Sequence, residues 1–68
     1  MTPTEIITKA TARLEAATTD ASMEVALDTG IGAIGALLDL GLISVHIWRA
    51  AIDNLDAMAE KRQAEPRV

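Results

Sequence analysis

The sequence predicts an all-α fold, a helical hairpin of two long or three shorter helices that associates into a helical bundle. Apolar residues recur at steps of three and four in both halves of the chain, and no alternation typical of a strand competes with this helical period. The chain has 68 residues and no cysteine. Disulfides therefore cannot supply the stability that so small a core lacks. We expect a single small domain over residues 1–68 that gains stability by association.

The first predicted helix begins close to residue 1. Thr2 can cap it, Pro3 suits its first position, and Glu5 stands where a capping box requires it. A narrow apolar stripe follows at helical spacing: Ile7, Ala10, Leu14, Ala17 and Ala21. Residues 18–20 could end this helix and cap a second one, or the helix could continue to about residue 28.

The clearest helix break in the sequence lies at residues 28–32. Gly30 can adopt the left-handed conformation that ends a helix, and Gly32 adds freedom beside it. Beyond this break we expect one long helix, because apolar residues alternate four and three apart from Leu27 to Ala59. Residues 61–68 form a charged tail that we expect to fray, and Pro66 is the last point at which a helix could survive.

The alternation after Leu27 predicts a coiled-coil seam and, through it, a homo-oligomer. Further apolar side chains such as Leu37 point away from the seam, so the predicted helix is apolar on several sides. One other helix of the same chain cannot bury all of these sides. The predicted interface residues are Leu27, Ile31, Ile34, Leu38, Val45, Trp48, Ile52 and Leu55. Asp39 and His46 lie beside the seam, and we expect them to pair between neighbouring helices and set their register.

Residues 29–48 allow a second interpretation. The only titratable members of this run of twenty residues are Asp39 and His46, and twenty residues is the length of a membrane-spanning helix. The free energy of insertion is near zero, because Asp39 offsets the gain from the Leu, Ile and Val side chains. The alternative is therefore a small single-pass protein of the inner membrane, holin-like or a regulatory subunit. The preferred location is the cytoplasm, because residues 1–5 lack a basic leader.

No group of residues predicts an active site, so we expect neither an enzyme nor a cofactor or metal. A single histidine and the lack of cysteine disfavour a metal centre. The glycines Gly30, Gly32 and Gly35 match a dinucleotide-binding spacing, but that motif requires a preceding strand and a surrounding β–α–β unit. Ser44 has no base within reach, because His46 points to another side of a helix.

Charge indicates the kind of partner. Ten acidic and six basic residues give a net charge of −4, and nucleic acid is not expected as a partner because phosphate affinity needs clustered Lys and Arg. Between Leu14 and Trp48 there are five acids and no Lys or Arg. The sequence thus predicts a non-enzymatic helical interaction or assembly protein. We expect it to self-associate through its apolar seam and to present an acidic surface to a basic protein or a larger assembly.

Overall fold

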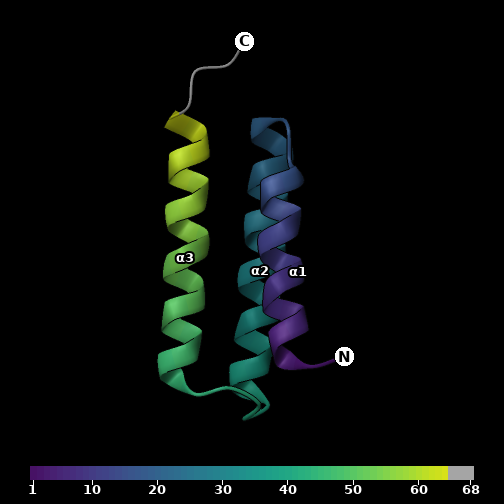
Figure 1. Cartoon of the computed structure of the whole chain (residues 1–68), viewed down its shortest axis with the longest axis vertical. Coiled ribbons are helices and arrows are strands. Elements are labelled where there is room, and N and C mark those ends of the chain that lie inside the picture. Colours follow the sequence, from purple (N-terminus) through teal and green to yellow (C-terminus); the bar gives the residue numbers. More distant parts are fainter. Residues whose placement is uncertain (65–68) are drawn as a thin grey trace.

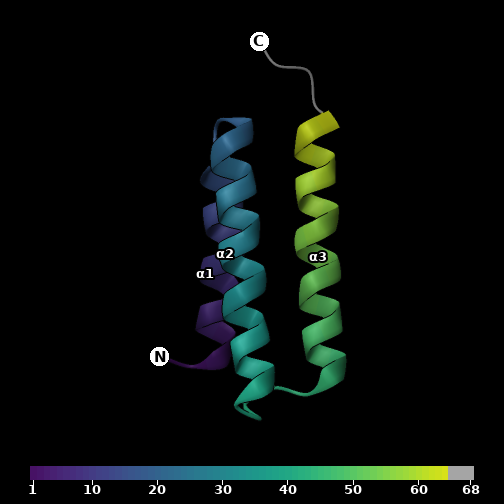
Figure 2. The same cartoon turned by 180° about the vertical axis from the view of Figure 1, so that it is seen from behind.

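A computed structural model of the chain describes residues 1–64, which form three helices packed side by side (Figure 1). Helix α1 spans Pro3–Ala16, α2 spans Asp20–Asp39 and α3 spans Val45–Ala64. Consecutive helices run in opposite directions, and α2 packs extensively against both α1 and α3, as the reverse view also shows (Figure 2). The all-α fold class is confirmed, in the form with three helices.

Helix α1 begins as its sequence predicts. The backbone N–H of Glu5 donates a hydrogen bond to the Thr2 hydroxyl, and the Glu5 carboxylate accepts one from the Thr2 N–H. This reciprocal pair is the predicted capping box. The helix ends at Ala16, which resolves the open alternative at residues 18–20 in favour of a turn.

A second capping box starts α2 directly after that turn. The Thr19 hydroxyl accepts a hydrogen bond from the Ser22 N–H, and the Ser22 hydroxyl accepts one from the Thr19 N–H. The turn also divides the predicted apolar stripe. Leu14 and Ala17 are buried, whereas Ala21 lies beyond the turn on α2 and is exposed, so its place in the stripe is wrong.

The predicted helix break at residues 28–32 is wrong, because these residues lie inside α2. Gly30 is buried where the three helices meet. A Cβ atom added to it would lie 3.1 Å from Cδ1 of Leu55 and 3.3 Å from Cβ of Ala10. This glycine therefore permits a close approach of α1 and α3 to α2 rather than a turn.

The chain turns at residues 40–44 instead, inside the stretch predicted as one long helix. Gly41 has a φ of 72°, in the left-handed region. Its N–H donates to the Leu38 carbonyl, and the Leu42 N–H donates to the Leu37 carbonyl. This is the Schellman arrangement that commonly ends a helix with glycine.

Ser44 starts α3 on the other side of this turn, since its hydroxyl accepts a hydrogen bond from the Ile47 N–H at 3.2 Å. The unbroken helix expected from Leu27 to Ala59 is thus wrong, and residues 29–48 do not form one membrane-spanning helix. Residues 61–64 of the segment expected to fray belong to α3. Residues 65–68, including Pro66, lie outside the described residues.

The core lies between the three helices and contains few large side chains. Leu14, Ile34 and Leu55, one from each helix, are fully buried, with at most 1% of their surface exposed. The other buried apolar residues are mostly small: Ala10, Ala17, Met23, Leu37, Ala51 and Ala59. Such a core brings the helices close together but buries little apolar area, so the free energy of unfolding of one chain is small.

Candidate functional site

One end of the bundle exposes a group of large apolar side chains. Leu40 and Leu42 in the α2–α3 turn are 72% and 56% exposed, and Val45 and Ile47 at the start of α3 are 60% and 50% exposed. We call these four residues the apolar tip. It lies at the end of the bundle where the chain passes from α2 to α3 (Figure 1). Large apolar side chains exposed together at one end of a bundle make that end a candidate contact site.

The backbone of the apolar tip makes its hydrogen bonds within the chain. The N–H groups of Gly41 and Leu42 are bonded to carbonyls of α2, and Ser44 caps the first turn of α3. The turn therefore holds a defined conformation without a partner. What it offers to another molecule is apolar side-chain surface.

The predicted seam residues mainly serve the core of the chain itself. Leu38 is half-buried and Val45 is exposed, as part of the apolar tip. The other six residues of the seam pack into or against the core of the same chain: Leu27, Ile31, Ile34, Trp48, Ile52 and Leu55. The seam thus joins α2 to α3, and its role as an interface between chains stays a prediction.

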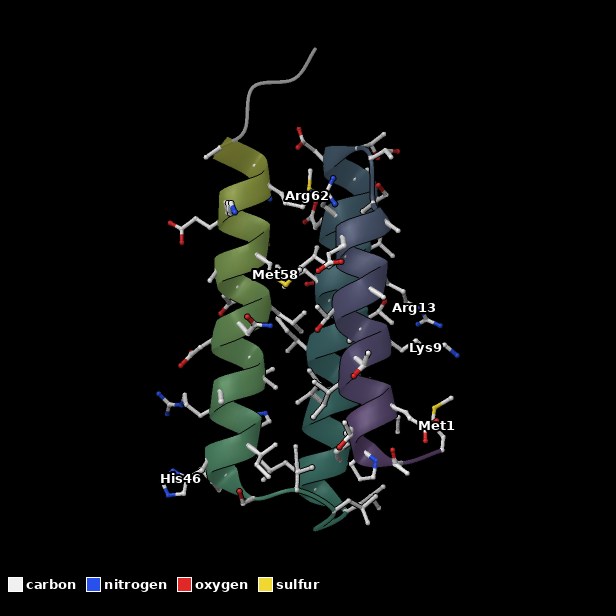
Figure 3. All side chains as sticks on the ribbon, viewed as in Figure 1. Met1, Lys9, Arg13, His46, Met58 and Arg62 are labelled. Carbon is white, nitrogen blue, oxygen red and sulfur yellow. The ribbon has the colours of Figure 1, made fainter. Side chains whose placement is uncertain are left out.

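Asp39 and His46 lie on either side of the α2–α3 turn, and both are exposed. His46 points away from α1 and α2 (Figure 3). Within the part of the chain that the structure describes, neither side chain makes a hydrogen bond or an ion pair. Their pairing between neighbouring helices, with a role in register, stays a prediction.

Trp48 lies next to the apolar tip along α3. It is half-buried and packs against the core. The guanidinium carbon of Arg49 lies 5.8 Å from the centre of the Trp48 ring, within the range of a cation–π interaction. The indole therefore belongs partly to the core, and a cation lies over its ring.

A second exposed surface follows the boundary between α1 and α2. Two hollows of about 270 and 550 Å³ lie there, and they share Arg13 of α1 and Thr29 of α2. We call the two together the α1–α2 groove. Lys9 also lines it from α1, and Val25, which is 65% exposed, lines it from α2. The sequence analysis does not predict this groove. Exposed residues of α2 nevertheless recur at steps of four and three, the same spacing as in the predicted seam.

Arg62 closes the end of the bundle opposite to the apolar tip. Its Nη1 donates a hydrogen bond of 2.8 Å to the Leu14 carbonyl and another to the Glu15 carbonyl, at the end of α1 (Figure 3). The Leu14 carbonyl also accepts a hydrogen bond of 3.3 Å from the Ala17 N–H, whereas the Glu15 carbonyl, in the last turn of α1, has no helical partner. A cation is favourable at this negative end of the helix dipole. The sequence does not predict this contact, because residues 61–68 are expected to fray.

Within residues 1–64, no three or more His, Asp or Glu side chains are grouped so that they could hold a metal ion. In the same range, every buried side-chain nitrogen and oxygen has a hydrogen-bond partner. No family model, curated protein or solved structure matches this chain. The apolar tip and the α1–α2 groove are therefore the features from which its function can be inferred.

Proposed function

We propose that the chain is a non-enzymatic helical assembly protein that self-associates and presents an acidic surface to a partner. The observation that carries this proposal is the apolar tip, whose four large side chains are each at least half exposed. Covering apolar surface contributes about 25 cal/mol per Å². Among the described residues only three large side chains are fully buried. Such a bundle has little stability of its own, so association would stabilise the folded chain as well.

The distribution of charge supports the second half of the proposal. The acids between Leu14 and Trp48 are all exposed, on a stretch without Lys or Arg: Glu15, Asp20, Glu24, Asp28 and Asp39. Complementary potentials accelerate encounter and select among partners. A basic protein surface is the partner that this distribution favours.

Self-association can be tested by making the apolar tip polar. The double variant Leu40→Gln, Leu42→Gln should keep its helical circular dichroism, because both side chains are exposed. It should raise the dissociation constant measured by sedimentation equilibrium at least about tenfold, which corresponds to about 1.4 kcal/mol. The matched control is Ala57→Gln, an exposed position on α3, which should leave the dissociation constant unchanged. A parent chain that stays monomeric up to about 1 mM would contradict the proposal.

One observation favours a second function, that of a membrane protein. Among the described residues, α2 is long and apolar enough to cross a bilayer, judged by length and composition alone. The candidate segment thereby moves from residues 29–48 to Asp20–Asp39. Core helices of soluble bundles meet the same criterion, so assembly remains the first proposal. Partition of the expressed chain into the detergent-rich rather than the aqueous phase would reverse this order.

A further inference from the structure

We infer that two copies of this chain pair side by side about a two-fold axis parallel to the helices, with α2 against α2. The inference rests on the proposed self-association and names the surface and the orientation that produce it. The contact surface is the exposed side of α2, where four residues follow one another at steps of four, three and four: Val25, Thr29, Gly32 and Ala36. We call these four residues the outer ridge.

The outer ridge is shaped for close contact with another helix. A Cβ atom added to Gly32 would meet nothing within 4 Å, so the backbone of α2 is accessible at this point. Steps of four and three are the spacing with which one helix packs along another, and small residues let the two backbones approach closely. The next step of four leads from Ala36 to Leu40, so the ridge continues into the apolar tip.

Opposite charges flank the outer ridge. On one side, Lys9 and Arg13 line the α1–α2 groove and project from the edge of α1 that faces away from α3 (Figure 3). On the other side, helical periodicity places Glu24 and Asp28, because they lie across the outer ridge from Ala26, which lines the groove. All four charged side chains are exposed, and within residues 1–64 none of them forms an ion pair.

The two charged flanks also lie at the same height along the bundle. Arg13 lines the same hollow as Val25 and Thr29, which brings it level with Glu24 and Asp28. A two-fold axis parallel to the helices leaves heights unchanged and places the basic flank of each copy beside the acidic flank of the other. An antiparallel pair would instead bring like charges together. Charge complementarity thus identifies a second copy as the occupant and parallel as its orientation.

Disulfide cross-linking tests the orientation directly, since the chain has no cysteine of its own. In the parallel pair each residue of the ridge meets its own copy. Val25→Cys and Ala36→Cys should therefore each form a covalent dimer on mild oxidation. In an antiparallel pair, neither variant would cross-link with itself, but a mixture of the two would. Ala57→Cys, exposed on α3, is the control that should stay monomeric under the same oxidation.

Charge reversal tests the complementarity. The variant Lys9→Glu, Arg13→Glu should raise the dissociation constant of the pair at least about tenfold. Adding Glu24→Lys and Asp28→Lys to the same chain should restore it, because every facing pair is again of opposite sign. Helical circular dichroism should remain, since all four positions are exposed.

The outcomes separate this inference from the proposed function. If charge reversal leaves association unchanged while Leu40→Gln, Leu42→Gln abolishes it, self-association stands and the paired α2 helices are rejected. Cross-linking only in the mixture of the two cysteine variants also rejects the parallel pair. A monomeric parent chain rejects both proposals.

Discussion

The two ends of the bundle contain the same parts, a helix end, a short turn and a capped helix start, but they present different surfaces. At the α1–α2 end, Thr19 and Ser22 cap each other's backbone, and Arg62 of α3 binds the last carbonyls of α1. At the α2–α3 end, Gly41 and Ser44 satisfy the backbone equally well. The side chains around them are nevertheless large, apolar and exposed.

This difference shows that the exposed apolar side chains do not result from an incomplete turn. Backbone hydrogen bonds within the chain hold both turns, so neither turn depends on the side chains of Leu40 and Leu42 for its conformation. At the α1–α2 end, Arg62 of α3 joins its helix to the end of α1 through a long-range hydrogen bond. The second end has no equivalent contact among residues 1–64, and its side chains remain available to another molecule.

The same substitution at the two ends should give the largest contrast. Leu14→Ala, in the last turn of α1, removes a fully buried side chain and should lower the free energy of unfolding by about 2–5 kcal/mol. Leu40→Ala at the apolar tip, where the side chain is 72% exposed, should lower it by less than about 0.5 kcal/mol. Urea denaturation at low protein concentration measures both. Equal losses would mean that the tip is buried within the folded monomer.

Removing the Arg62 contact at the α1–α2 end should have the next largest effect on the free energy of unfolding. Arg62→Ala removes the donor of the Glu15 carbonyl and leaves the Leu14 carbonyl with the Ala17 N–H alone. It should cost about 1–3 kcal/mol in thermal or urea unfolding. Lys61→Ala is the matched control, because Lys61 is exposed and has no partner among the described residues. Similar losses for the two variants would show that the Arg62 contact adds nothing to stability.

At the opposite end, Gly41→Ala should cost about 1–2 kcal/mol, because alanine is strained in the left-handed conformation. Gly35→Ala provides the comparison, since Gly35 is helical and an added Cβ would meet nothing within 4 Å. Gly35→Ala should raise the free energy of unfolding by about 0.5–1 kcal/mol. A Gly41→Ala variant as stable as the parent chain would contradict the assignment of Gly41 as the residue that ends α2.

The two cap residues should give the smallest difference between the ends. Thr19→Ala and Ser44→Ala each remove one hydroxyl that accepts a backbone hydrogen bond, so each should cost about 1 kcal/mol. Thr18→Ala, at an exposed hydroxyl outside both caps, should leave the melting temperature unchanged. A loss at only one cap would show that one turn depends on contacts other than its own hydrogen bonds.

The sequence predicts the helical class and the start of α1 because both depend on local signals. Thr2 and Glu5 lie three residues apart, and their capping box requires nothing from the rest of the chain. The prediction for Gly30 is wrong for the opposite reason. Gly30 and Gly41 look alike in sequence, and only the positions of Ala10 and Leu55 in the folded bundle decide that Gly30 permits a close approach.

The prediction of one long helix is wrong because a helical period of apolar residues does not show where the chain turns. Helices α2 and α3 face the same core, so the steps of four and three continue across residues 40–44 even though the chain reverses there. The turn itself is also hard to predict, because turns are usually recognised by polar residues and this one contains large apolar ones. The outer ridge could not be recognised for a related reason, since its exposure depends on which faces of α2 meet α1 and α3.

The bond between Arg62 and the end of α1 also bears on the order in which the chain folds. Its two residues are 48 positions apart, so forming it early would require the closure of a long, unstructured loop. Helices α1 and α2 are neighbours along the chain and can pair first, at a much lower cost in chain entropy. An interaction that forms after the transition state acts on the rate of unfolding rather than on the rate of folding. We therefore expect the Arg62 contact to slow the unfolding of the chain and so to prolong the lifetime of its folded state.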